Sequence, residues 1–132
     1  MIRLTPEQHV FLVERHLATL TTLRPDGSPH VVPVAFTWDA EKGALRITTR
    51  DRSAKVRHIE AGAGSRRVAV CQVDGGRWLT LEGVATVLRD EDEVVEAMRR
   101  YAVRYQALDP DPQRVVVRVE VDRLLGSDYM TR

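Results

Sequence analysis

Hydroxyl groups and positive charges gather between residues 48 and 57 of this chain. Alternating apolar and polar residues from 44 to 50 predict a half-buried strand. Ser53 is a suitable N-cap for a helix whose inner face would carry Val56 and Ile59. The corner between strand and helix then collects six polar side chains: Thr48, Thr49, Arg50, Arg52, Ser53 and Lys55. Hydroxyls, cations and free helix N–H groups together predict an anion site, typically for phosphate.

Lysine usage singles out one residue of this corner. Of the 20 basic residues, 18 are arginine, and the only lysines are Lys42 and Lys55. Lys42 falls in a predicted turn at Asp39–Gly43, whereas Lys55 falls on the first turn of the predicted helix. Neither GxGxxG nor GxxxxGK[ST] occurs, so a serine-capped helix with solvated cations stays open as the alternative.

Composition narrows the functional classes. A chain of 132 residues predicts a single domain, 1–132, with its own core. A net charge of +1, scattered basic residues and 5% aromatic residues argue against nucleic-acid binding. The one cysteine, Cys71, lies in an apolar run and is expected to be buried, and no histidine or cysteine spacing predicts a metal site. Without a signal peptide or an apolar run near 18 residues, we expect a cytoplasmic protein.

The elements expected around the corner are mostly strands. Helices are predicted at 5–15, from Ser53 to a glycine-rich end at 61–64, and after Asp90, the last with an inward stripe of Val94, Met98, Tyr101, Ala102 and Tyr105. Six strands are predicted at 16–23, 29–38, 44–49, 68–73, 77–89 and 115–121, followed by a tail at 124–132. Gly27 suits a hairpin turn. Pro33 interrupts the second strand and predicts a sheet edge or a bulge, and Gly83 predicts a bend or a bulge.

This pattern predicts a mainly β protein, a small closed six-stranded barrel with a few helices. Side chains fill the interior of such a barrel, so a ligand site is expected on the outside, in a groove completed by a second subunit. Trp78, beside the Gly75–Gly76 turn, would provide a flat wall for that groove. Packing of Trp78 in a dimer interface is a compatible alternative.

Several segments, in this order, resemble a known family. They are ERHLATLTTLRPDGSPHVVPVAFTWD (14–39), SAKVR (53–57), QVDGGRWLTLEG (72–83), RYAVRY (100–105) and RVVVRVEVDRLLGS (114–127). Together they resemble the split β-barrel flavin and deazaflavin oxidoreductases, which are related to pyridoxamine-phosphate oxidase and include FMN-binding members. The first segment is similar to the actinobacterial branch that uses coenzyme F420, and the whole set is similar to the F420-dependent biliverdin reductases of that branch.

The resemblance implies a homodimer with two cofactor sites at the subunit interface. It places the cofactor phosphate at Lys55, with Thr48, Thr49 and Ser53 as hydroxyl partners. The tricyclic ring would lie against the backbone of His30, Val32, Pro33 and Val34, with Trp78 of a second subunit beside it. Arg50, Arg52 and Arg57 would face the acidic polyglutamate tail of F420, which FMN lacks.

The activity that the resemblance implies is hydride transfer from reduced F420 to a conjugated acceptor, biliverdin giving bilirubin. No catalytic residue is identified, and His30 and the nearby arginines are proton-donor candidates by position only. Some members carry arginine in place of Ser53 and asparagine in place of Pro33, so FMN remains an alternative cofactor. An F420-dependent enone or quinone reductase and a non-catalytic carrier of F420 or a tetrapyrrole also remain open. Pyridoxamine-phosphate oxidation is disfavoured, because the longer C-terminal segment of those oxidases is missing.

Overall fold

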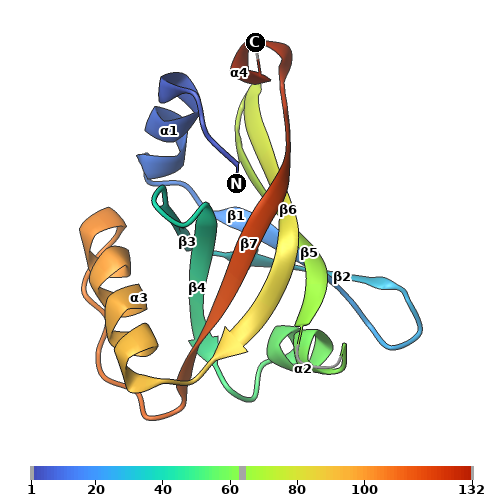
Figure 1. The fold of residues 1–132 in the computed structure, drawn as a ribbon, viewed down its shortest axis with the longest axis vertical. Coiled ribbons are helices and arrows are strands. Elements are labelled where there is room, and N and C mark those ends of the chain that lie inside the picture. Colours follow the sequence, from blue (N-terminus) through green and yellow to red (C-terminus); the bar gives the residue numbers. More distant parts are fainter. Residues whose placement is uncertain (1, 63–64, 132) are drawn as a thin grey trace.

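One seven-stranded antiparallel sheet dominates the computed structural model, which describes residues 2–62 and 65–131 (Figure 1). The strands run in the order β2-β1-β5-β6-β7-β4-β3 across the sheet. They are β1 (Ala18–Leu23), β2 (Pro29–Val34), β3 (Phe36–Asp39), β4 (Ala44–Arg50), β5 (Ser65–Asp74), β6 (Arg77–Leu88) and β7 (Arg114–Gly126). The helices are α1 (Pro6–Val13), α2 (Ala54–Glu60), α3 (Glu91–Arg104) and the single-turn α4 (Asp128–Thr131). No helix in the described part is long and apolar enough to cross a membrane.

The two edges of the sheet are held together by the chain itself. β2 and β3 lie at opposite ends of the strand order, yet only Ala35 separates them in sequence. Consecutive Cα atoms lie about 3.8 Å apart, so the end of β2 must stand beside the start of β3. The sheet is therefore curled into a barrel-like shape, and no ladder between β2 and β3 closes it among the described residues.

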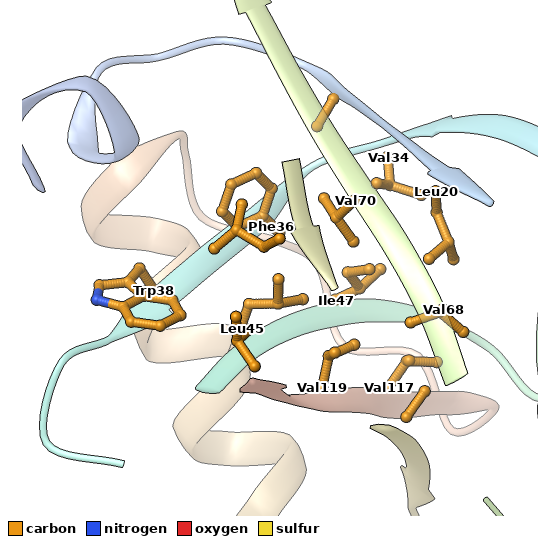
Figure 2. Packing of buried hydrophobic residues seen from close by; sticks show 14 of the residues in the cluster. Leu20, Val34, Phe36, Trp38, Leu45, Ile47, Val68, Val70, Val117 and Val119 are labelled. Carbon is orange, nitrogen blue, oxygen red and sulfur yellow. The ribbon is translucent and has the colours of Figure 1, made fainter. Parts of the chain in front are cut away.

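The core fills the inside of this curl. Figure 2 shows apolar side chains from several strands converging there, with Phe36, Ile47 and Val70 near the middle. Three helices also add buried side chains to this core: α1 contributes Phe11 and Leu12, α2 contributes Val56 and Ile59, and α4 contributes Met130. Thr5 and Gln8 form a capping box at the start of α1, as the sequence predicts.

The predictions of six strands and of a closed barrel are wrong, because the sheet has seven strands and its two edge strands do not pair among the described residues. The predicted strand at 29–38 is two strands that belong to opposite edges, and the break falls at Ala35 instead of Pro33. Pro33 stays in the ladder opposite Thr19, which is tolerated because β2 is an edge strand. The prediction of a short tail from residue 124 is also wrong, since β7 runs to Gly126 and α4 follows it. Gly83 does mark a register shift between β6 and β7, as predicted.

Smaller differences concern the helices and the cysteine. α1 ends at Val13, two residues before its predicted end. On α3 the buried residue is Ala97, while Ala102 is exposed, because Ala102 lies about 100° around the helix from Tyr101. Cys71 is half-buried and not fully buried as expected. The predicted glycine-rich end of α2 includes residues 63 and 64, which lie outside the described residues.

Candidate functional site

The predicted strand-to-helix corner opens into a pocket of about 290 Å³. Its lining comes from four parts of the chain: the β2–β3 junction, β4, α2 and the segment from α3 to β7. Among the residues predicted for the site, Pro33, Val34, Thr48 and Lys55 line it together. Tyr101 and Arg114, which the sequence analysis did not select, line it as well.

Lys55 brings a poorly solvated positive charge to this pocket. Its side chain is half-buried, and the burial lowers the pKa of its ammonium group. Within residues 2–62 and 65–131 no carboxylate forms an ion pair with Lys55. A desolvated cation without a counter-ion favours the binding of an anion, which restores the interaction lost with water.

Arg114 adds a second cation. One of its terminal nitrogens, Nη2, donates to the carbonyl oxygen of Asp109 at 2.7 Å, while its Nε is buried and has no hydrogen-bond partner in the described part of the chain. The β4–β7 register sets Arg114 directly opposite Arg50. Like charges in such a pair repel, and Asp111 relieves the repulsion by accepting from Arg50 Nε at 3.2 Å. Only the register reveals this pair, which explains why sequence patterns missed Arg114.

The other predicted polar residues surround the start of α2. Ser53 occupies the N-cap position, but its hydroxyl makes no hydrogen bond to a helix N–H and instead accepts from the Thr49 hydroxyl at 3.4 Å. Arg57 donates to the carbonyl oxygen of Arg52 at 2.6 Å, and both side chains are exposed. The hydroxyl hydrogen of Ser53 and the first N–H groups of α2 are therefore available at this corner, as an anion site requires, whereas the Thr49 hydroxyl already donates to Ser53.

β2 presents two different faces along the predicted ring-binding segment. His30, Val32 and Val34 are half-buried or buried, whereas Val31 and Pro33 are exposed. The ring of His30 meets the ring of His58 of α2 edge-on, with centroids 4.8 Å apart. Nδ1 of His58 lies 2.9 Å from the buried Thr22 hydroxyl, and burial lowers the pKa of His58, helped by the nearby positive charges.

Trp78 is not brought to the pocket within one chain. It is the second residue of β6, at the end that carries α4, where its carbonyl oxygen accepts from the N–H of Ser127 at 3.2 Å. α2 lies towards the opposite end of the sheet (Figure 1). Trp78 can therefore meet the pocket only from a second copy of the chain.

A cluster of possible metal ligands lies elsewhere. Glu14, His16 and Asp74 place their ligand atoms within 4.8 Å of one another, a grouping that the sequence analysis did not expect. Arg77 pairs with both carboxylates of the cluster, at 2.9 Å from Glu14. The hydrogen bond from Arg77 is the main reason that the pKa of Glu14 falls to about 2, so a guanidinium already balances the negative charge here.

Comparison with known proteins identifies the family. Residues 4–127 match the family model described as pyridoxamine 5'-phosphate oxidase. The chain belongs to this family. A relative in it is an F420H(2)-dependent biliverdin reductase from Mycobacterium tuberculosis, 48% identical over 125 residues, which cover 95% of this chain and 89% of the relative. A shorter match, 39% over 57 residues, is to a 5a,11a-dehydrotetracycline/5a,11a-dehydrooxytetracycline reductase from Streptomyces rimosus; it covers 42% of this chain and 40% of that protein.

Solved structures of the same fold support the family assignment. An F420 reductase superposes with a TM-score of 0.72 and 25% identity, covering 89% of this chain and 94% of that one. A conserved hypothetical protein from Mycobacterium tuberculosis reaches a TM-score of 0.81 at 22% identity, covering 98% of this chain and 87% of that one, a likeness of fold. The curled sheet and its helices are thus the fold of the pyridoxamine 5'-phosphate oxidase family.

Proposed function

We propose that this member of the family is an F420-dependent oxidoreductase that reduces biliverdin to bilirubin. The observation that carries the proposal is the 48% identity to an F420H(2)-dependent biliverdin reductase over 95% of the chain. The pocket at the start of α2 supports it independently, because it combines two cations with a threonine hydroxyl.

The residues of this pocket fit a phosphate-bearing cofactor. Lys55 and Arg114 would hold the phosphate, since both bring positive charge to the pocket without a carboxylate partner among the described residues. Thr48 lines the same pocket, and Thr49 and Ser53 stand beside it at the helix start. Hydrogen bonds from the hydroxyls of Thr48 and Ser53 would fix the orientation of the phosphate, and the Thr49 hydroxyl, which donates to Ser53, would hold the Ser53 side chain in place.

The ring system of the cofactor would lie along β2. This strand is a sheet edge, so on its outer side its backbone groups are not used by another strand of the described sheet. The backbone from His30 to Val34 can therefore contact a flat ring, while the half-buried Val32 and the buried Val34 anchor the strand to the core. Pro33 lacks a donor, so hydrogen bonds to the ring would come from its neighbours.

Bound reduced F420 supplies a hydride to an electron-poor acceptor. Biliverdin accepts a hydride at its central methine carbon and a proton at a pyrrole nitrogen, and this gives bilirubin. The task of the chain is to hold the two molecules in contact and to exclude water. His30 stands at the start of the ring-binding segment and is our candidate by position for delivering the proton.

The acidic tail of F420 would leave the pocket along the start of α2. Arg52 and Arg57 are exposed there, whereas Arg50 is partly neutralised by Asp111. Replacing Arg50, Arg52 and Arg57 with glutamine should weaken F420 binding far more than FMN binding. Equal loss for both cofactors would remove these arginines from the tail site.

A homodimer would complete the site. Trp78, Val73 and Leu125 share one outer face of the sheet, because Val73 pairs with Trp78 and Leu125 pairs with Thr80, two residues further along β6. Val73 and Leu125, which lie on the strands to either side of Trp78, are 57% and 41% exposed, so this face offers apolar surface that an interface could cover. We propose that this face brings Trp78 to the cofactor pocket of a second copy.

The deciding experiment is a fluorescence titration of the purified protein with F420 and with FMN. The proposal expects F420 to bind at least tenfold more tightly, and reduced F420 then to convert biliverdin with loss of the biliverdin absorbance. A preference for FMN would overturn the cofactor assignment. Tight F420 binding without turnover of biliverdin would instead favour another acceptor, such as an enone or quinone, or a carrier without catalysis.

A further inference from the structure

Two arginines are fixed at the turn end of the β1–β2 hairpin. Arg24 donates through Nη1 to the carbonyl oxygen of Pro29 at 2.6 Å, and Arg66 of β5 donates through Nη1 to the carbonyl oxygen of Leu23 at 3.0 Å. Leu23 and Pro29 face each other in the ladder, so both guanidinium groups are attached to one end of the hairpin. Each keeps further N–H donors, and its position is set before any ligand arrives.

Two histidines lie beside these arginines. His30 follows Pro29 and contacts His58 edge-on at 4.8 Å, while His58 Nδ1 lies 2.9 Å from the Thr22 hydroxyl. Arg24 and Arg66 are both close enough to lower the pKa of His58, after burial and the neighbouring His30. We call the four residues Arg24, Arg66, His30 and His58 the hairpin patch.

The acidic groups nearest in sequence are already engaged. Asp26 accepts hydrogen bonds from both the N–H and the hydroxyl of Ser28, at 2.9 and 2.6 Å. Asp51 and Glu60, on either side of α2, both pair with Arg89 at 2.7 Å. Arg24 and Arg66 form no ion pair within the described residues, although Arg24 is close enough to help lower the pKa of the Asp26 carboxyl group. The hairpin patch is therefore a cationic surface whose two guanidinium groups are not held in ion pairs by the part of the chain that the structure describes.

We propose that the hairpin patch binds the carboxylates of the electron acceptor, the two propionate groups of a linear tetrapyrrole. This inference rests on the proposed function, and it deepens it by naming the part of the substrate that the chain recognises. Arginine pairs well with carboxylates through parallel N–H donors. The two propionate chains of biliverdin flank its central methine carbon, so they must lie close to the atom that receives the hydride.

The position of the hairpin patch fits that requirement. His30 belongs both to the patch and to the β2 segment against which the cofactor ring is proposed to lie. A tetrapyrrole stacked on the ring would therefore place its carboxylates at the hairpin end. The tail of F420, in contrast, would start from the phosphate at Lys55 and pass the exposed Arg52 and Arg57 at the start of α2.

The test compares biliverdin with its dimethyl ester, which lacks both charges. The variants are Arg24→Gln, Arg66→Gln and the double variant, and the matched control is Arg67→Gln. Arg67 is the next residue on β5, so its side chain leaves the opposite face of the strand, and it is paired with Asp122 at 2.7 Å. Binding of each bilin to the protein without cofactor is followed by absorbance, alongside the KM and kcat for biliverdin with reduced F420 and the Kd of F420.

We expect each single variant to weaken biliverdin binding about three- to tenfold and to raise its KM equally, with kcat nearly unchanged. Binding of the dimethyl ester, the Kd of F420 and all properties of Arg67→Gln should stay as in the native protein. Equal losses for biliverdin and its ester, or a selective loss of F420 affinity, would overturn the inference and assign the patch to packing or to the cofactor tail. If the native protein neither binds nor reduces biliverdin, the proposed function itself fails.

Discussion

Lys55 and Arg114 line the same pocket, although one lies on α2 and the other begins β7. Neither forms an ion pair with a carboxylate in the described ranges, although Arg114 is close enough to Asp111 to help lower the pKa of that carboxyl group. An anion bound beside Lys55 would restore the charge interaction that burial takes from its ammonium group. The lining of the pocket therefore suits an anion, and the phosphate of the cofactor is the ligand that we propose.

Lys55→Ala should reduce cofactor affinity about tenfold or more, because a charge-assisted hydrogen bond to the phosphate is lost. Arg114→Gln should act in the same direction. The matched control is Lys42→Ala, which removes the other lysine of the chain from the exposed turn before β4. Fluorescence titration measures the affinity, and circular dichroism checks the fold. Unchanged binding in Lys55→Ala would remove this residue from the phosphate site.

The strand and the helix that form the corner at residues 48–57 could be predicted from sequence because both elements depend on local patterns. The strand at 44–50, the N-cap position and the buried Val56 and Ile59 all follow from patterns within a few residues, and the structure has them. The hydroxyl of Ser53 is an exception, since it bonds to Thr49 and not to the helix. Local patterns describe neighbours along the chain, and they succeed where the site uses such neighbours.

The missed features depend on contacts between distant segments. Arg114 and Tyr101 enter the pocket only through the β4–β7 register and the packing of α3. The split of the predicted strand at Ala35 likewise depends on which strands β2 and β3 pair with, and these are β1 and β4. Sequence spacing carries little information on such pairings, because a continuous apolar run fits one long strand or two short ones equally well.

Trp78→Ala tests the proposed interface. The variant should dissociate at higher protein concentration than the native dimer, or bind the cofactor more weakly, because it removes a large apolar side chain from an apolar face. Analytical ultracentrifugation over a concentration series measures the first property, and F420 titration measures the second. Trp78→Phe is the conservative control and should retain most of both. A Trp78→Ala variant that is unchanged in both properties would contradict the assignment.

Gly83→Ala should destabilise the sheet strongly. A Cβ at this position would lie 1.9 Å from the carbonyl oxygen of Glu120, at the register shift between β6 and β7. Backbone cannot move aside as a flexible side chain can, so we expect a loss of about 3 kcal/mol in the free energy of unfolding, measured with urea.

Gly75→Ala is the matched control for that variant. A Cβ there meets no atom within 4 Å, but Gly75 has φ +60°, so a smaller loss of about 1 kcal/mol is expected from backbone strain alone. Equal losses in the two variants would show that the close approach to Glu120 is not what requires Gly83.

Arg89 lies outside the pocket and balances two negative charges at the ends of α2. It donates to Asp51, just before the helix, and to Glu60, the last helical residue, both at 2.7 Å, and these hydrogen bonds lower the pKa values of both carboxyl groups. Arg89→Gln would leave two unbalanced negative charges beside an anion site, so phosphate-bearing cofactors should bind about three- to tenfold more weakly. High salt should reduce this loss, because it screens exposed charges.

Neutralising Asp51 and Glu60 in the Arg89→Gln variant tests whether unbalanced charge causes the loss of cofactor affinity. Adding Asp51→Asn and Glu60→Gln to Arg89→Gln removes the unbalanced charges and should restore most of the affinity, measured by F420 titration at low and high salt. A triple variant that binds as weakly as Arg89→Gln would mean that Arg89 acts by holding α2 in place and not through charge. Native affinity in Arg89→Gln would rule out both roles. Thermal unfolding of each variant separates a loss of ligand binding from a loss of fold, because only the second lowers Tm without ligand.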